Sequence, residues 1–183
     1  MNEKRLIHKI RKGNQEALEF LISELYPSIY AFVYRKMQGD DIAKDITQEV
    51  FVRMIREVMT YREEGKLLHY LYRIASNLCV DEYRRRKVRC HEDLDEVEHM
   101  ICDEGNLHEE VLQLMDKEEL LEQIGTLPYV QQDVLLLHYF HQLTYQEIAT
   151  AYGLALSTVK SRHRAALNAL YTKMKGDWVY EER

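Results

Sequence analysis

The chain has few of the residues that interrupt helices. Its 183 residues include two Pro and seven Gly, and segments in which β-branched and polar residues alternate are almost absent. Pro and Gly mark the turns of sheet-rich folds, so their scarcity argues against many short strands. Apolar residues instead recur at helical spacing throughout the sequence. This pattern predicts an all-α fold class.

Cysteines and long apolar runs are also scarce. The three cysteines cannot all pair and form no C-x-x-C motif, so we expect reduced thiols. A zinc site could be read from Cys90, His91, His99, Cys102 and His108, but their spacing matches no common template, and we expect no metal and no cofactor. No apolar run reaches 18 residues and the N-terminus does not resemble a secretory signal. We therefore expect a cytoplasmic protein without membrane insertion.

Negative charge is confined to one short part of the chain. The net charge is −6, but residues 1–90 carry +5, residues 91–124 carry −12 and residues 125–183 carry +1. The two flanking parts are therefore free to meet an acidic polymer. Apolar periodicity also lapses after residue 88. We expect two small helical domains, 1–90 and 109–183, joined by an acidic flexible linker at 91–108.

The first four helices expected in the first domain run over about 3–12, 15–26, 29–37 and 41–59, with Pro27 between the second and third. Asp40 or Asp41 is expected to cap the last of these, whose apolar face is formed by Ile42, Ile46, Val50, Phe51, Met54, Ile55 and Val58. The opposite face carries a compact acidic and amide patch, Asp45, Gln48 and Glu49. This patch suits a basic partner helix, or is simply a solvated face.

Tyrosines and cations interleave through the expected loop at 60–68 and the helix that follows it. Flat rings on which unpaired bases can stack, with cations nearby for the backbone, are typical of single-strand binding. Some of the tyrosines could instead belong to the core, and we expect Tyr72 to do so because it lies close to the Leu71 and Ile74 face. Among these tyrosines and cations, the candidate nucleic-acid residues are Tyr61, Lys66, Tyr70, Arg73, Arg84 and Arg85.

Residues 143–170 read as a helix-turn-helix. Thr144 and Glu147 have the spacing of a capping box, and Gly153 can take the left-handed conformation that ends a helix. Ser157 is expected to cap the second helix, and Val130 is expected in the core beneath the motif. Hydroxyls and cations crowd the start of that second helix, as in a major-groove reader: Ser157, Thr158, Lys160, Ser161, Arg162 and Arg164. An ordinary αα-hairpin with a charged face is the alternative.

Three motifs in order resemble the small extracytoplasmic-function (ECF) type of bacterial sigma factor. They are DIAKDITQEVF, LHYLYRIASNLCVDEYRRR and LPYVQQDVLLLHYFHQLTYQEIATAYGLALSTVKSRHRAAL. The resemblance implies that Asp45, Gln48 and Glu49 dock on the clamp coiled coil of the polymerase largest subunit. It implies that the loop at 60–68 and the face around Asn77 take a flipped base of the −10 element. The helix-turn-helix would read the −35 element, and the acidic linker would thread toward the RNA exit path.

The partners implied by the resemblance are core RNA polymerase, promoter DNA and an anti-sigma factor. The chain departs from the family pattern at Tyr70, where Trp is usual, at Ala165 and Leu167, where bases are frequent, and at His163, which is usually apolar. The alternative reading is a helix-turn-helix regulator that is not a polymerase subunit. An enzyme is not expected, because no catalytic triad order, paired catalytic carboxylates, Gly-rich phosphate loop or H-E-x-x-H motif occurs.

Overall fold

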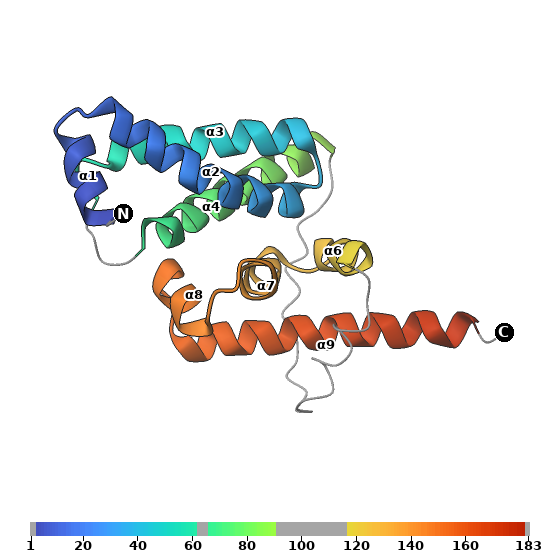
Figure 1. The fold of residues 1–183 in the computed structure, drawn as a ribbon. Coiled ribbons are helices and arrows are strands. Elements are labelled where there is room, and N and C mark those ends of the chain that lie inside the picture. The colour runs from blue at the N-terminus through green and yellow to red at the C-terminus, as the bar shows by residue number, and fades with distance from the viewer. Residues whose placement is uncertain (1–2, 62–65, 91–116, 182–183) are drawn as a thin grey trace.

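The computed structural model describes residues 3–61, 66–90 and 117–181. Within these ranges every regular element is helical, which confirms the all-α prediction (Figure 1). The expected linker at 91–108 and the start of the helix expected from Glu109 lie outside the described residues. The elements in chain order are α1 (Glu3–Arg11), α2 (Gln15–Met37), α3 (Asp40–Glu57), α4 (Leu67–Cys90), α6 (Lys117–Gly125), α7 (Tyr129–Leu135), the π-helical turn η1 (Leu136–Phe140), α8 (Tyr145–Tyr152) and α9 (Leu156–Glu181).

Helix α2 runs straight through Pro27, so the two separate helices expected on either side of it are wrong. The Asn14 side chain caps the start of α2 by accepting a hydrogen bond from the Ala17 amide at 2.7 Å. The buried stripe continues from Leu21 before the proline to Ile29 after it. Pro27 itself is exposed. Packing of the same face on both sides of the proline therefore offsets the backbone hydrogen bond that it cannot make.

Neither Asp40 nor Asp41 caps α3, because the helix already begins at Asp40. Gly39 occupies the cap position without a side-chain bond, and Asp40 lies in the first turn. There its carboxylate accepts hydrogen bonds from Lys44 and the Tyr30 hydroxyl, which lower the pKa of Asp40. A carboxylate in the first turn also interacts favourably with the helix dipole.

The apolar face of α3 is confirmed except at Ile55. Ile46, Val50, Met54 and Val58 are buried, whereas Ile55 is 42% exposed. At about 100° per residue, Ile55 lies half a turn away from Ile46. It therefore falls beyond the edge of the face that α2 and α4 cover.

The second half consists of α6, α7, η1, α8 and α9. The capping box of Thr144 and Glu147 is present at the start of α8, and Gly153 ends that helix with a φ of 63°. Ser157 does not cap α9, because the helix begins at Leu156 and the Ala155 carbonyl accepts the first helical hydrogen bonds. The two-helix motif expected from the sequence is thus confirmed, with its second helix starting slightly earlier.

Helix α7 is buried from Gln131 onward, but Val130 is 46% exposed, so its expected place in the core is wrong. The turn before α7 is stabilised by a polar side chain instead. The Gln132 amide donates to the carbonyls of Gly125 at 3.1 Å and Leu127 at 2.8 Å. Val130 precedes the stretch that lies between α9 and the first half (Figure 1).

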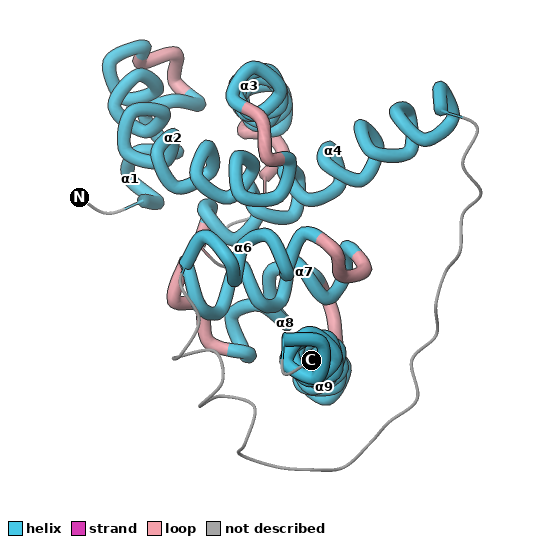
Figure 2. The backbone as a smooth tube through the Cα atoms, turned by 90° about the vertical axis from the view of Figure 1, so that its right-hand side faces the viewer, coloured by secondary structure: helices cyan, strands magenta, loops and turns pink. Residues whose placement is uncertain are grey.

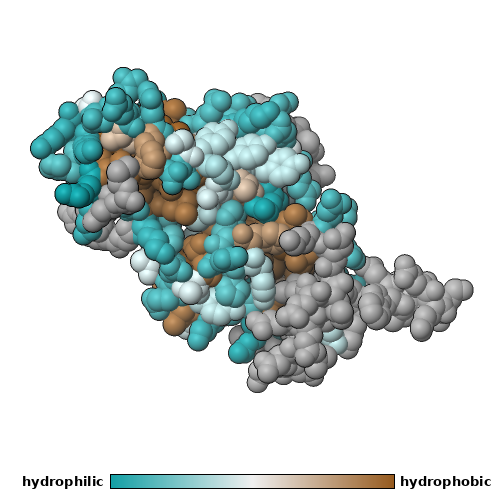
Figure 3. All heavy atoms as spheres, in the orientation of Figure 1, coloured by the Kyte–Doolittle hydropathy of each residue, from teal (hydrophilic) through white to brown (hydrophobic). Residues whose placement is uncertain are grey.

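The two halves pack directly on each other. Helix α4 lies against α8, and α2 contacts η1. Figure 2, turned by 90°, shows the same stacking, with α2, α3 and α4 above and the second half below. On the face seen in Figure 3, hydrophilic residues predominate and hydrophobic residues reach the surface in a few patches. The relative placement of the halves is therefore defined by contacts between their helices.

Candidate polymerase and promoter interfaces

The acidic and amide patch of α3 is on the surface. Asp45 and Gln48 are exposed, while Glu49 is half-buried and accepts a hydrogen bond from Arg53 Nε at 2.9 Å. None of the other described residues forms a hydrogen bond or ion pair with the Asp45 carboxylate. Asp45 therefore offers an unpaired charge to a partner, whereas the charge of Glu49 is partly offset by Arg53.

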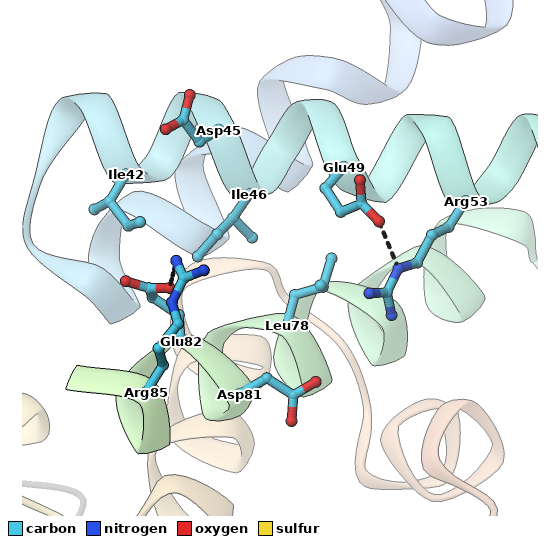
Figure 4. A pocket seen from close by; sticks show the side chains of 9 residues that line it. All are labelled: Ile42, Asp45, Ile46, Glu49, Arg53, Leu78, Asp81, Glu82 and Arg85. Carbon is cyan, nitrogen blue, oxygen red and sulfur yellow. Dashed lines mark hydrogen bonds and ion pairs between the residues drawn. The ribbon is translucent and has the colours of Figure 1, made fainter. Parts of the chain in front are cut away.

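A groove of about 330 Å³ separates this patch from α4 (Figure 4). Ile42, Ile46 and Leu78 contribute apolar walls, and Asp81 and Glu82 line the α4 side. Glu82 pairs with Arg85 and with Arg86, whose Nε lies 3.1 Å from its carboxylate. The acids on the α4 side could not be assigned to the patch from the sequence, because residues on two helices come together only in the folded chain.

The two candidate stacking tyrosines form one aromatic site. The rings of Tyr61 and Tyr70 lie 5.1 Å apart between centroids, tilted by 45°, and the Arg73 guanidinium lies 5.2 Å from the Tyr70 ring. The Tyr70 hydroxyl donates to the Glu57 carboxylate. Burial and this bond raise the pKa of Tyr70 to about 12, so its hydroxyl stays protonated. Both rings are half-buried, which fixes them while leaving part of each ring accessible.

Helix α1 positions this aromatic site, which the sequence analysis missed. Arg11 Nε donates to the Val58 carbonyl at 2.9 Å, and its Nη2 donates to the Tyr61 carbonyl. On the other side of the loop, the Glu3 carboxylate accepts from the Leu67 amide at 3.0 Å, at the first residue of α4. These pairs are separated by 47 to 64 residues, so no local spacing in the sequence could have indicated them.

Helical spacing divides the remaining candidates on α4. Tyr70, Asn77 and Arg84 are seven residues apart and share one side of the helix, with Arg73 beside them. Arg73, Asn77 and Arg84 are exposed. Arg85 lies elsewhere, in the groove toward α3, and Lys66 pairs with Glu147 of α8 at 2.8 Å. Four of the candidates thus lie along one side of α4, with Tyr61 beside Tyr70. Arg85 lies apart from them in the groove, and Lys66, one turn before Tyr70, is paired with α8.

The candidate major-groove residues lie at the start of α9. Ser157, Lys160, Ser161 and Arg164 are exposed, whereas Thr158 and Arg162 are half-buried rather than fully outward. The opposite face, including Val159, Ala166 and Leu170, is buried as expected. The exposed end of α9 therefore carries donors and cations that can reach phosphates or base edges.

The unusual His163 completes the buried face of α9. It is 7% exposed, and its Nε2 lies 3.1 Å from the Tyr139 hydroxyl, with the Tyr145 hydroxyl 3.3 Å away. Burial, aided by the nearby His138, lowers the pKa of His163 to about 4. The imidazole is therefore neutral at physiological pH and acts as a polar core residue, with two tyrosines as its partners.

Acidification should destabilise the fold through His163. Its folded pKa of about 4 lies below its ordinary value of 6.5, so between these values the unfolded chain binds a proton that the folded chain does not. The contribution of neutral His163 to the free energy of unfolding is fully present above about pH 6.5, and it is lost as the pH falls toward 4. At 1.36 kcal/mol per pKa unit, it amounts to at most about 3 kcal/mol. We expect His163→Gln to flatten the fall of the unfolding free energy measured by denaturant titration from pH 7 to 5.

The matched control is His8→Gln on the exposed side of α1, which should leave the pH dependence unchanged. Some dependence should remain in His163→Gln, because burial also lowers the pKa of His141 to about 4. If the free energy of unfolding falls equally with pH in wild type and His163→Gln, His163 is not the source of the pH dependence.

Neither a metal cluster nor a membrane-spanning helix is found among the described residues. In that part of the chain, no three His, Cys, Asp or Glu side chains are grouped so that they could hold a metal ion. Its helices also include none that is both long and apolar enough to cross a membrane. Cys79 is buried as a free thiol. The five residues considered for zinc all lie outside the described side chains.

Comparison with known families matches both halves of the chain. Residues 21–89 match the family described as Sigma-70 region 2, and residues 117–170 match the family described as Sigma-70, region 4. The first match contains α3, α4 and the aromatic site. The second contains α7, α8 and the exposed start of α9. Both sets of candidate residues therefore lie inside matched regions.

Similar proteins cover nearly the full length. The chain is 28% identical over 181 residues to the ECF RNA polymerase sigma factor SigW of Bacillus subtilis, covering 94% of this chain and 96% of that one. It is also 28% identical over 181 residues to the ECF RNA polymerase sigma-E factor of Escherichia coli, covering 93% of each.

Two solved structures share the fold. Sigma factor RpoE of Bartonella quintana, solved with the anti-sigma factor NepR, has a TM-score of 0.64 and 19% identity, covering 86% of this chain and 96% of that one. CnrH, solved with the cytosolic domain of CnrY, has a TM-score of 0.69 and 20% identity, covering 96% and 98%. With two sigma-70 regions in order and full-length relatives of one type, this chain belongs to the sigma-70 family, as an ECF RNA polymerase sigma factor.

Proposed function

We propose that this chain binds core RNA polymerase, directs it to specific promoters and initiates transcription there, without catalysing a reaction itself. The observation that carries the proposal is the presence of both sigma regions in order, each with its candidate contact residues at the surface. We assign 1–90 to polymerase binding and the −10 element, 91–108 to an acidic linker, and 109–183 to the −35 element. The chain would act in the cytoplasm, where the polymerase works.

The polymerase contact is assigned to Asp45, Gln48 and Glu49. Exposed Asp45 and Gln48 lie on the same stretch of α3 as half-buried Glu49, and the groove beside them is lined by further acids of α4. A basic partner helix lying along α3 would meet complementary charge. The clamp coiled coil of the polymerase largest subunit is the expected partner.

The −10 contact is assigned to Tyr61, Tyr70, Arg73, Asn77 and Arg84, with Lys66 and Arg85 as flanking cations. Two fixed rings and an exposed amide on one side of α4 can receive an unstacked base by stacking and edge hydrogen bonds. The −35 contact is assigned to Ser157, Thr158, Lys160, Ser161, Arg162 and Arg164 at the start of α9.

An anti-sigma factor is the third proposed partner. The similar Bartonella sigma factor was solved with one. A protein of this class would inhibit the chain by covering its polymerase-binding or promoter-binding surfaces.

Run-off transcription with purified core polymerase tests the proposal. Adding this chain to polymerase that lacks sigma should produce transcripts with defined starts from a genomic library. A conventional regulator would bind DNA but would neither co-migrate with core polymerase nor support initiation by it. Failure to co-migrate, together with absence of defined transcripts, would reject the sigma function.

Replacing the cations of α9 should weaken promoter binding. We expect Lys160→Ala, Arg162→Ala and Arg164→Ala each to lower affinity, and at least one to change the preferred base in the −35 element. A bidentate guanine contact contributes about 1–3 kcal/mol against the wrong base. Loss of a phosphate contact instead lowers the affinity for all sequences alike. Binding to a panel of −35 variants distinguishes these cases. Lys173→Ala, further along α9, serves as the control. Equal losses on every variant for all three mutants would show that none of them reads sequence.

A further inference from the structure

The start of α9 is held in the second half by four aromatic rings. They belong to His138 and Tyr139 in η1, Tyr145 at the first residue of α8 and His163 in α9. We call these four residues the histidine cluster. Five pairs of these rings lie 4.4 to 5.6 Å apart between centroids. Side chains from three helical elements therefore meet behind the exposed start of α9.

Both ring nitrogens of His163 have a hydroxyl partner from another element. Nε2 lies 3.1 Å from the Tyr139 hydroxyl of η1, and Nδ1 lies 3.3 Å from the Tyr145 hydroxyl of α8. A neutral imidazole has one donor and one acceptor, and a hydroxyl can act as either, so both bonds can form in either tautomer. Hydrogen bonds depend on direction, whereas apolar burial does not. The two bonds therefore restrain the rotation of α9 about its axis more than an apolar contact would.

The two tyrosines are themselves held in place by His138. Its Nδ1 lies 2.8 Å from the Leu143 carbonyl, so the ring N–H donates to the turn before α8. The His138 ring stacks on Tyr145 at 4.4 Å with the planes 25° apart, and it contacts Tyr139 edge-on at 5.0 Å. The partners of His163 thus form a frame whose side chains are fixed by packing and hydrogen bonding before any DNA binds.

His163 lies on the buried side of α9, at the level of the residues assigned to the −35 element. It is 7% exposed, whereas Lys160 and Arg164 are exposed. At 1.5 Å per residue, both cations lie within about 5 Å of His163 along the helix axis. At a radius of about 5 to 6 Å, turning α9 by about 10° moves a surface side chain by about 1 Å. Groups that recognise a ligand must be held to within about 0.5 Å, so this rotation is sufficient to misplace a base contact.

We propose that His163 is a positioning residue for base recognition: bonded to the Tyr139 and Tyr145 hydroxyls, it holds α9 in one rotation, and without it α9 samples several. The effect on recognition rests on the −35 contact proposed above, whereas the effect on α9 does not. Phosphate contacts fix orientation but carry no sequence information, and base edges carry it. Loss of the positioning residue should therefore lower discrimination between −35 bases more than it lowers overall affinity.

Binding of the holoenzyme to a panel of promoters measures this discrimination. Core polymerase with the full chain is titrated onto a promoter found in the run-off experiment and onto variants with one −35 base changed. The ratio of the two dissociation constants should be about fivefold to 150-fold in wild type at a base that is read. His163→Leu should lower that ratio by about threefold or more. His163→Gln, whose amide supplies a donor and an acceptor, should keep it within about twofold.

A matched control and a second variant separate positioning from general damage. His141→Leu replaces another histidine paired with a tyrosine, 2.8 Å from the Tyr72 hydroxyl, but its ring packs on the first half, so the ratio should stay as in wild type. His163→Leu with Tyr139→Phe and Tyr145→Phe removes both sides of each bond. Since replacing both partners by apolar groups is nearly neutral, this variant should keep its stability and still discriminate poorly.

Nuclear magnetic resonance of the free chain tests the rotation of α9 without DNA. Relaxation dispersion detects exchange on the microsecond-to-millisecond scale. The backbone amides of residues 157–164 should show such exchange in His163→Leu and none in wild type.

Three results would overturn the proposal. They are wild-type discrimination in folded His163→Leu, an equal loss in His163→Gln, which would leave hydrogen bonding without a role, and flat dispersion in His163→Leu. If wild-type holoenzyme distinguishes no −35 bases at all, the proposed −35 contact fails instead. The dispersion measurement on the free chain would then still decide whether His163 fixes the rotation of α9.

Discussion

Asp45→Arg is expected to abolish binding to core polymerase while leaving the protein folded. The Asp45 carboxylate is exposed and has no partner among the described residues, so reversing its charge should alter a binding surface and not the core. Opposing a basic partner with a like charge typically costs several kcal/mol. At about 1.4 kcal/mol per factor of ten, affinity should fall by about 100-fold or more. Fluorescence anisotropy with labelled chain and core polymerase measures this loss.

A second variant and a control complete this test. Gln48→Ala with Glu49→Lys should also abolish binding, although it breaks the Glu49–Arg53 pair and is therefore the less specific change. Glu122→Arg reverses an exposed acid on α6 in the second half and should bind as wild type does. Wild-type affinity in Asp45→Arg would remove α3 from the polymerase contact.

Loss of the aromatic site should impair promoter opening and spare duplex binding. We expect Asn77→Ala, or Tyr61→Ala with Tyr70→Ala, to keep closed-complex affinity within a few-fold and to lower open-complex formation. Stacking contributes about 1–3 kcal/mol per base, so the loss should be about fivefold to 150-fold. A template with a pre-melted −10 bubble should restore part of the activity. Permanganate footprinting of unpaired thymines measures the open complex.

Tyr70→Phe is the matched control for this experiment. It retains the ring beside Tyr61 and Arg73 but removes the hydrogen bond to Glu57, so it should open promoters nearly as well as wild type. Circular dichroism and thermal melting establish that the alanine variants are folded, which matters because Tyr70 is half-buried. Normal opening by folded alanine variants would show that these side chains do not capture bases.

Local spacing in the sequence was sufficient for much of the helical structure. The Thr144–Glu147 capping box, the left-handed Gly153 and the buried stripe of α3 all depend on residues within a few positions of one another. The exposed patch of Asp45 and Gln48 follows from the same periodicity, since it lies opposite that stripe. The family resemblance, carried by three motifs, supplied the expected role of each surface.

Apolar periodicity predicted the wrong burial at positions where exposure depends on whether another helix covers the residue. The sequence marks Ile55 and Val130 as apolar, but neither is covered by another helix, so both remain exposed. Pro27 predicts a break, yet packing on both sides of it keeps α2 continuous. Propensity and pattern describe a helix in isolation, and tertiary contacts override them at single positions.

The sequence by itself determined which segments are helical and which faces are polar, because these depend on interactions between residues three or four apart. Only the tertiary structure decided that Arg11 fixes the loop of Tyr61, that Lys36 is buried against Asp133, and that Lys66 meets Glu147. The last two pairs are separated by 97 and 81 residues. In the sequence, such a charged residue looks like part of a solvated face, and its neighbours do not indicate a distant partner. Its burial depends on how whole helices pack.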